Sequence, residues 1–367
     1  MKVKIPYRLC VLGICATLAL PAFSDSEGSY KNNMFNPVRT SVTSLSIAPD
    51  ARAGVGISYT PWLRKLVNDI NLANVAGFYR IGDYSAVSAS LRFFSLGEVF
   101  LSDMEDMTIN PYEFAIDAGY SRMLSERFSM AVNMRFIFSD IRYDYTAESS
   151  AGKAFAADIA MYRLGYFMMG SRECSFAWGL NINNIGSKIS YGGDDNAEFI
   201  PTNLRLGLNM TVPFNEYNKF SVAVDANKLL VPTYPKQDTE NGETDNDYTD
   251  RVQKDYYDVS PIAGIFKSFY DAPNGFKEEM QEIQWSVGCE YTYNDRFMLR
   301  GGYHHEAANK GNRKYFTVGA GFHMSVFTVD ASYVFSTSQT NPLDQTMRFS
   351  LGFDLDGMRD LFGKRRR

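Results

Sequence analysis

The segment from Glu173 to Gly186 alternates large apolar residues with small or polar ones over most of its length. Successive side chains of a β-strand point to opposite sides, so this pattern predicts a two-faced strand. One face carries Cys174, Phe176, Trp178, Leu180 and Ile182, and the other carries Ser175, Ala177, Gly179, Asn181 and Asn183. A soluble sandwich buries such an apolar face against a second sheet, whereas a membrane barrel turns it toward lipid.

The composition favours the membrane barrel without requiring it. Beyond its first residues the 367-residue chain has no run of about 20 apolar residues, which a membrane-spanning helix needs. A barrel tolerates the mean hydropathy of -0.25, because only alternate residues face lipid. The net charge of -5, with basic residues scattered singly, gives no electrostatic footprint for nucleic acid, and we expect no nucleic-acid partner.

The N-terminus has the organisation of an export signal. Lys2, Lys4 and Arg8 precede the apolar run Leu9 to Leu20, and small residues follow, so we predict a signal peptide over residues 1–24. A lipoprotein site at Cys15 is the weaker alternative. Residues 25–53 then form a periplasmic or lumenal segment. Of the cysteines that remain, Cys174 and Cys289 both have apolar-face parity, and we predict unpaired, lipid-facing thiols rather than a disulfide.

The alternating pattern recurs fourteen times between residues 54 and 355. The predicted strands are 54–59, 71–80, 84–95, 112–123, 127–139, 153–168, 173–185, 202–212, 218–228, 283–293, 296–305, 314–324, 326–335 and 346–355. Short and long connections alternate between them, and the longest connection spans 229–282. Short periplasmic turns with long extracellular loops are typical of an outer-membrane barrel, and an even strand count fits closure. Residues 356–367 are read as a basic, solvated periplasmic tail.

The face opposite the apolar one carries charges of both signs. Basic residues on a lipid face would cost about 2 to 4 kcal/mol each at the midplane, so this face is assigned to the lumen. We expect a lumen network that includes Arg92, Asp117, Arg135, Arg205, Asp225, Arg300, Asp330 and Arg348, with Asp158, Glu290 and Asp354 beside them. Its charges either pair with one another and fill the barrel, which we favour, or line a selective pore.

Motifs for chemistry are scarce. His305 has outward parity near a strand end, but nothing marks the partner serine that a barrel hydrolase needs, so we predict no enzyme. His304 and His305 lack companions at metal-ligand spacing, and the acidic segment Lys236 to Asp258 lacks the glycine of a calcium loop. We therefore expect no metal and no cofactor, and a solvated external loop over 236–258.

Two long connections have helical spacing. Residues 262–270 and 276–283 predict helices that pack within the longest loop, as a lid or a partner surface. In the first loop, TPWLRKLVNDI places Trp62, Leu63 and Leu66 on one side of a short helix. That helix either packs on the barrel rim or offers a docking surface for a protein.

Several motifs carry a family resemblance. SYTPWLRKLVNDINLA (58–73), SIAPDARAG (46–54), ASLRFFSLGEV (89–99) and NPYEFAIDAGYSRMLSERFSMAVNMRFI (110–137) resemble the PorV family of the Bacteroidetes type IX secretion system, itself similar to FadL-type fatty-acid transporters. The resemblance implies a fourteen-stranded, non-enzymatic barrel in the outer membrane. It also implies that the barrel receives cargo with a C-terminal sorting domain from the type IX translocon and passes it to a PorU-type sortase complex.

The resemblance places cargo binding on the extracellular side, at Pro61, Trp62, Leu63 and Arg64. This chain departs from the family where Gly54, Val55 and Gly56 run straight into SYTPW, without the Gly-rich and Asn-Pro-Ala segments that form a lumenal hatch. The alternatives are a FadL-like transporter of hydrophobic small molecules and, with less support from so charged a lumen, a general porin.

Overall fold

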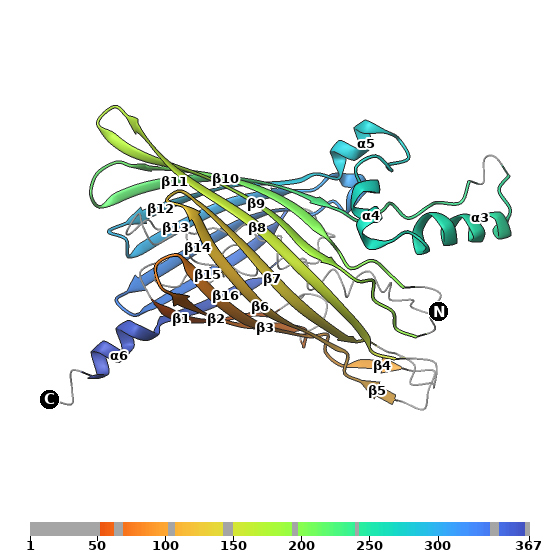
Figure 1. Cartoon of the computed structure of the whole chain (residues 1–367), viewed down its shortest axis with the longest axis horizontal. Coiled ribbons are helices and arrows are strands. Elements are labelled where there is room, and N and C mark those ends of the chain that lie inside the picture. The colour runs from red at the N-terminus through yellow and green to blue at the C-terminus, as the bar shows by residue number, and fades with distance from the viewer. Residues whose placement is uncertain are drawn as a thin grey trace.

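The computed structural model describes residues 52–61, 69–101, 107–141, 150–192, 197–238, 242–337 and 345–363. Within these residues, fourteen antiparallel strands close a barrel (Figure 1). The barrel strands are β1 (Ala53–Pro61), β2 (Asn71–Ile81), β3 (Ser85–Ser95), β6 (Tyr112–Ser125), β7 (Phe128–Asp140), β8 (Gly152–Met169), β9 (Arg172–Gly186), β10 (Asn203–Pro213), β11 (Asn218–Leu229), β12 (Gln284–Tyr293), β13 (Phe297–His305), β14 (Lys314–Met324), β15 (Phe327–Ser336) and β16 (Met347–Asp354). The predicted barrel is confirmed.

The first and last strands close the ring. β1 pairs with β16 from Gly54 opposite Asp354 to Tyr59 opposite Phe349, while its other edge pairs with β2. Every barrel strand therefore has a hydrogen-bonded neighbour on both sides. Closure removes the open edge that would leave backbone N–H and C=O groups without partners in lipid.

Short connections lie at one end of the barrel, here named the turn end. Long connections lie at the other end, here named the loop end. At the turn end residues 294–296 link β12 to β13. Asn294 and Asp295 have φ values of 53° and 52°, and the Arg296 N–H donates to the Tyr293 carbonyl at 3.1 Å, which is the tight turn with two left-handed central residues that fits the twist of a hairpin. The loop end carries the small hairpin β4 (Val99–Leu101) and β5 (Met107–Ile109), the helices α3 (Asp245–Val252), α4 (Pro261–Lys267) and α5 (Phe276–Gln281), the π-helical turn η3 (Gln253–Tyr257) and the 3-10 turn η4 (Ala308–Lys310).

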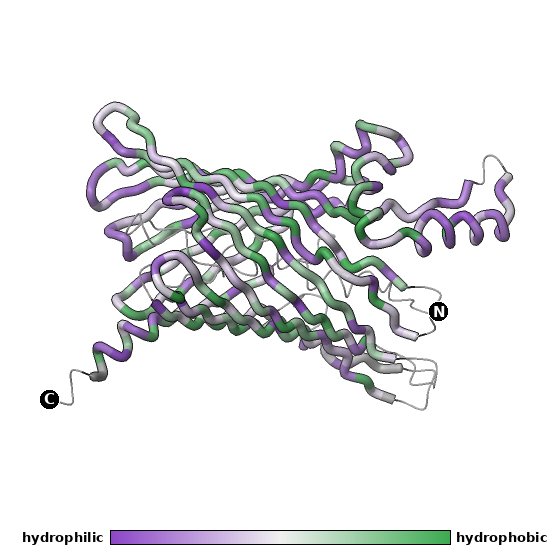
Figure 2. Tube along the Cα trace, viewed as in Figure 1, coloured by the Kyte–Doolittle hydropathy of each residue, from purple (hydrophilic) through white to green (hydrophobic). Residues whose placement is uncertain are grey.

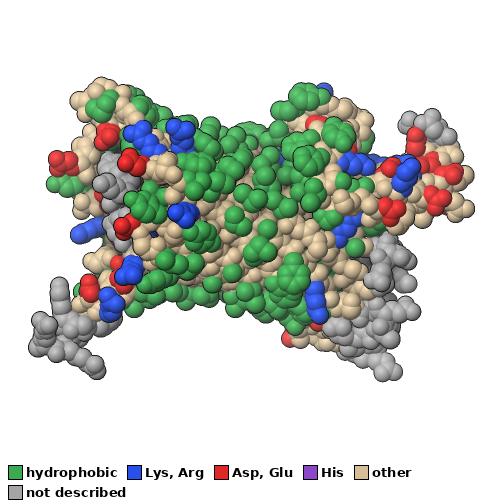
Figure 3. Space-filling view, viewed as in Figure 1, with side chains coloured by type: hydrophobic (Ala, Val, Ile, Leu, Met, Phe, Trp, Pro, Cys, Tyr) green, Lys and Arg blue, Asp and Glu red, His purple; other side chains and the backbone are tan. Residues whose placement is uncertain are grey.

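Burial in the barrel is the inverse of that in a soluble protein. Charged side chains such as Arg92, Arg135 and Asp158 are fully buried inside, whereas Leu91, Met134 and Ile159, one position away on the same strands, are exposed outside. Figure 2 shows hydrophobic and hydrophilic residues alternating along the strands. Figure 3 shows hydrophobic side chains covering the middle of the barrel, with most charged side chains toward its two ends. Such an apolar band is the lipid-facing surface of a membrane barrel.

Three details differ from the sequence prediction. The prediction of two lipid-facing thiols is correct for Cys289, which is exposed, and wrong for Cys174, which is fully buried; both cysteines are free. The hairpin of β4 and β5 was not predicted, since its strands are only three residues long. Helix α6 (Leu355–Gly363), which lies at the turn end where the tail begins, was not predicted either (Figure 1). None of the helices in the described ranges has the length and apolarity to cross a membrane.

Candidate functional site: a paired lumen wall and a tied loop end

Arg135 on β7 forms the centre of the lumen wall between β3 and β9. Its Nε donates to Asp117 on β6 at 2.5 Å, and a terminal nitrogen donates to Asp158 on β8 at 2.8 Å. Ser90 on β3 donates to the second oxygen of Asp117 at 2.7 Å. All four side chains are buried, so each charge replaces its lost hydration with bonds to its neighbours.

A β-bulge in β9 adds an amide to this cluster. The β8–β9 register shifts between Ala157 and Ile159, and Asn184 has a φ of 57°, a left-handed conformation that asparagine tolerates better than most residues. The extra residue turns Asn184 inward, where its side-chain oxygen accepts a bond from Arg135 and its backbone N–H donates to Asp158 at 2.8 Å. A regular alternation assigns Asn184 to the outer face, so the sequence pattern alone missed it.

A second charged cluster lies on the wall formed by β12 to β15. Arg300 on β13 is 2.5 Å from Glu290 on β12 and also 2.5 Å from Asp330 on β15. The second bond passes over β14, where a Cβ at Gly321 would lie only 2.5 Å from the Asp330 carboxylate. A glycine in the intervening strand is therefore what lets the ion pair reach across it.

The other predicted lumen residues also face inward. Arg205 and Asp225, on neighbouring strands β10 and β11, are 3.1 Å apart. Arg92 is fully buried on β3, and Arg348 is partly buried on β16. Of the predicted set, the structure thus brings Asp117 to Arg135, Arg205 to Asp225 and Arg300 to Asp330. This arrangement supports a lumen wall of paired charges rather than a pore lined by free charges.

The connection from β9 to β10 folds into the mouth of the barrel. Ile189 and Ile200 are buried against the inner face of β6 to β8, in a cluster with Ala115, Ile137, Ala154 and Ala156. Tyr191 packs on this cluster and donates to Ser139 at 2.9 Å. The sequence suggested the longest loop as a lid or a partner surface. In the described residues this shorter connection enters the lumen, and it carries no helical spacing that would have predicted it.

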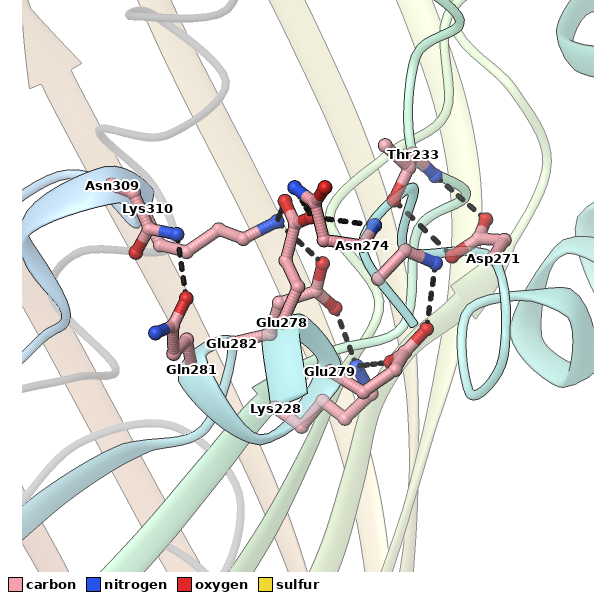
Figure 4. Close-up of polar contacts among 11 residues, drawn as sticks. Lys228, Thr233, Asp271, Asn274, Glu278, Glu279, Gln281, Glu282, Asn309 and Lys310 are labelled. Atoms are coloured by element: carbon pink, nitrogen blue, oxygen red, sulfur yellow. Dashed lines mark hydrogen bonds and ion pairs between the residues drawn. The ribbon is translucent and has the colours of Figure 1, made fainter. Parts of the chain in front are cut away.

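The longest loop is instead tied down by ion pairs around α5 (Figure 4). Lys228 at the end of β11 contacts Glu279 and Glu282 at 3.0 and 2.6 Å. Lys310 in η4 contacts Glu278 and Glu282 at 2.7 and 2.9 Å, so Glu282 joins the two lysines. Through α5, the loops after β11 and β13 form one unit.

A second tie joins the loop after β9 to η3. Lys188 lies 4.1 Å from the ring centre of Phe199, and its ammonium donates to the carbonyl of Tyr257 at 2.6 Å. Glu198 accepts bonds from the hydroxyls of Tyr256 and Tyr257. Burial and the nearby Glu198 carboxylate raise the pKa of Tyr257, so the phenol stays protonated and keeps donating.

The segment 236–258 is more ordered than the sequence suggested. Thr244 caps the N-terminus of α3 by accepting from the backbone N–H of Asp247, and Arg251 contacts Glu243 at 2.7 Å. The expected solvated loop therefore contains a helix, and most of its side chains from Thr244 to Asp250 are exposed as expected, whereas Val252 and Tyr256 are buried. Across the described ranges, His, Cys, Asp and Glu side chains form no group of three that could hold a metal.

The predicted cargo-binding residues lie at the edge of what the structure describes. Pro61 ends β1 at the loop end, paired with Asn71 of β2, whereas Trp62, Leu63 and Arg64 fall outside the described residues. Of the histidines, His304 faces inward, where its Nδ1 is 2.9 Å from the Ser286 hydroxyl. Both side chains are fully buried, which leaves no open face for a substrate.

The family model of the type IX secretion system protein PorV matches residues 29–236, more than half of the chain. This chain belongs to the PorV family. The match includes the lumen cluster around Arg135 and the loop that follows β1. No curated protein matches the chain.

Solved structures similar to this PorV-family barrel include several outer-membrane barrels. A TodX monoaromatic hydrocarbon channel mutant is 12% identical, with a TM-score of 0.45 over 83% of this chain and 90% of that one. The Ralstonia pickettii toluene transporter TbuX is 10% identical, with a TM-score of 0.37 over 88% and 97%. CdiB from Acinetobacter baumannii is 11% identical, with a TM-score of 0.43 over 82%, and this chain spans 60% of it. At such identities the function of these proteins does not transfer to this one.

We expect Arg135→Met to destabilise the barrel, because it leaves the buried carboxylates of Asp117 and Asp158 without their cation. Removing one partner of a buried ion pair costs about 3 to 5 kcal/mol in the free energy of unfolding. Urea unfolding of the barrel in vesicles measures the change. Arg127→Met, at an exposed turn position, is the matched control and should leave the unfolding midpoint in place. Equal midpoints for the two variants would contradict the role of Arg135.

We expect Lys228→Met to release α5 while the barrel stays folded. The variant loses charge-assisted bonds worth about 1.5 to 3 kcal/mol, so the α5 amides should exchange hydrogen at least about tenfold faster. Hydrogen–deuterium exchange by peptide mass spectrometry measures the rate. Lys254→Met, at an exposed position of η3, is the control. Unchanged exchange in α5 would show that packing alone holds the helix.

The same helix should loosen in acid. The bond from Lys310 lowers the pKa of Glu278 to about 2, below its ordinary value of 4.5. A lowered folded-state pKa stabilises docking fully above about pH 4.5, and the stabilisation is lost as the pH falls through about 2. Exchange of the α5 amides, corrected for intrinsic rates, should therefore rise between about pH 5 and about pH 2. Glu278→Gln should remove this pH step, and an identical step in the variant would assign it to another group.

Proposed function

We propose that this barrel binds secreted cargo carrying a C-terminal sorting domain and passes it from the type IX translocon to a PorU-type attachment complex. The observation that carries the proposal is the PorV family match over residues 29–236, which makes the chain a component of type IX secretion. The family and the barrel fold suggest a component of secretion or transport rather than an enzyme. Localisation follows from the fold, since a closed barrel with an apolar outer band belongs in the outer membrane.

Cargo contact is proposed for the extracellular segment Pro61 to Arg64. Pro61 stands at the loop end of the barrel, and the sequence that follows combines an indole, an aliphatic side chain and a guanidinium, types that are common in binding hot spots. Elsewhere at the same end of the barrel, contacts of Lys188, Lys228 and Lys310 join the loops that follow β9, β11 and β13, and these joined loops offer a firm base for a partner. A signal peptide over residues 1–24 remains part of the proposal, as the route to the outer membrane.

A shuttle does not need an open pore, and the paired lumen wall is consistent with that. The charges of Arg135 and Arg300 bind carboxylates of the wall itself, which stiffens the barrel under the loops. The alternative, a FadL-like transporter of hydrophobic small molecules, would need an apolar path. The described lumen instead presents polar and charged side chains on most strands.

A pull-down with a purified cargo sorting domain as bait tests the proposal. We expect the intact barrel to bind and the double variant Trp62→Ala, Arg64→Ala to lose most of the binding, since hot-spot residues of these types each contribute about 2 kcal/mol or more. Heat-modifiable migration on a gel shows that the variant is folded. Lys153→Ala, an exposed residue of β8, is the control.

Binding that survives in the double variant would move the cargo site to other loops. Absence of binding by the intact barrel, together with uptake of fatty acids or aromatics into vesicles that contain it, would favour the transporter.

A further inference from the structure

The lipid-facing surface carries an aromatic ring near the loop end on most of the strands, but not on β2, β9, β10 and β11. Examples around the circumference are Tyr59, Phe93, Phe138, Phe155, Trp285 and Phe316. Several of these rings contact a neighbouring ring. The ring centres of Trp285 and Tyr303 are 5.6 Å apart, and those of Tyr303 and Phe316 are 4.8 Å apart. Such a girdle marks the level where headgroups meet acyl chains, because aromatic side chains prefer that boundary.

The girdle is interrupted on one side. Strand β2 lacks a loop-end aromatic but lies between Tyr59 and Phe93, whereas β9, β10 and β11 are three consecutive strands without one. Their outward residues at this level are aliphatic or small, namely Ile182, Ile185, Leu204, Leu206 and Ala226. The last outward residue of β11 is Lys228, which α5 covers.

Helices α4 and α5 and the turn between them (residues 261–281), here named the overhang, lie beyond the loop end of β10 and β11 (Figure 1). The two helices and the turn between them expose large apolar side chains that a water-facing loop would not favour: Ile262, Phe266, Phe269, Tyr270, Phe276 and Met280. Phe276 and Tyr270 are 79% and 74% exposed. Figure 3 shows hydrophobic side chains on this overhang next to those of the barrel band. A contiguous exposed patch of this kind marks a contact surface.

The structure holds the overhang in place and neutralises its acids. The acidic side chains of α5 are bound by Lys228 and Lys310, so they do not repel anionic lipid. The ring of Phe269 lies 5.9 Å from the Lys228 ammonium, which links the turn after α4 to the barrel wall. Gly264 faces Phe199 and Pro232 so closely that an added Cβ would lie 2.8 Å from the Phe199 ring. α5 is thus anchored to the end of β11, and α4 to the loops that follow β9 and β11.

We propose that α4 and α5 complete the loop-end aromatic girdle, with Phe266, Phe269, Tyr270 and Phe276 seated in outer-leaflet lipid beside β9, β10 and β11. The occupant is lipid rather than a protein, because the patch continues an interface that the barrel already makes with lipid and fills its one wide interruption. Lys277, exposed next to Phe276, is placed to meet lipid phosphates, as basic residues beside an interfacial apolar face commonly do.

Site-directed spin labelling of the full-length protein tests the proposal. Phe276→Cys and Tyr270→Cys are each made in a background whose native cysteines are changed to alanine, labelled with a nitroxide, and placed in phosphatidylethanolamine and phosphatidylglycerol vesicles. Collision with oxygen, which concentrates in lipid, is compared with collision with a water-soluble nickel complex. Val224→Cys on the outer face of β11 is the lipid reference, and Asp250→Cys on α3 is the water reference. Heat-modifiable migration shows that each variant is folded.

We expect the oxygen-to-nickel ratio at positions 270 and 276 to lie well above the Asp250 reference and toward the Val224 reference. Ratios equal to the water reference would overturn the proposal. Labels that are water-accessible in vesicles but become shielded in native outer membranes would overturn it in favour of a protein partner. The outcome does not depend on cargo binding, so it stands apart from the test of the proposed function.

Discussion

The pairing of β1 with β16 is the contact on which the rest of the molecule depends. Lipid offers no hydrogen bonds, so a sheet in the membrane has to satisfy every backbone group within itself, and only a closed ring does so. Closure at Gly54 and Asp354 sets the ring at fourteen strands in the described chain. Once the ring is closed, alternate side chains face lipid or the lumen. The polar and charged side chains in the lumen must then hydrogen-bond or form ion pairs with one another.

The lumen wall shows how that requirement is met. Arg135 and Arg300 each bind two carboxylates from two other strands, and in both arrangements a local exception to regular strand structure contributes. For Arg135 the exception is the bulge that turns Asn184 inward, and for Arg300 it is Gly321, which leaves room for the ion pair. Charge neutralisation and backbone irregularity are thus coupled in this barrel.

The strands and their faces could be predicted from the sequence because the lipid face tolerates few charges, so the period of two is visible in residues such as Met134 and Arg135. The parts that escaped prediction depend on contacts between distant segments. Cys174 has the parity of a lipid-facing residue and is nevertheless buried, and Asn184 changes face through a bulge. Ile189 enters the lumen because Ala115 and Ile137 offer it an apolar surface there, which no local pattern reveals. Of the predicted cargo-binding segment Pro61 to Arg64, the structure describes only Pro61.

The ties at Lys188, Lys228 and Lys310 have a mechanical consequence. A force on α4 or α5 reaches β9, β11 and β13 together, rather than the end of one strand. A pull along these strands loads many interstrand hydrogen bonds at once, since those bonds run across the strand direction. Shear of this kind resists force far better than the one-by-one opening of a hairpin, so the loop end is built to bear load without deforming the barrel beneath it.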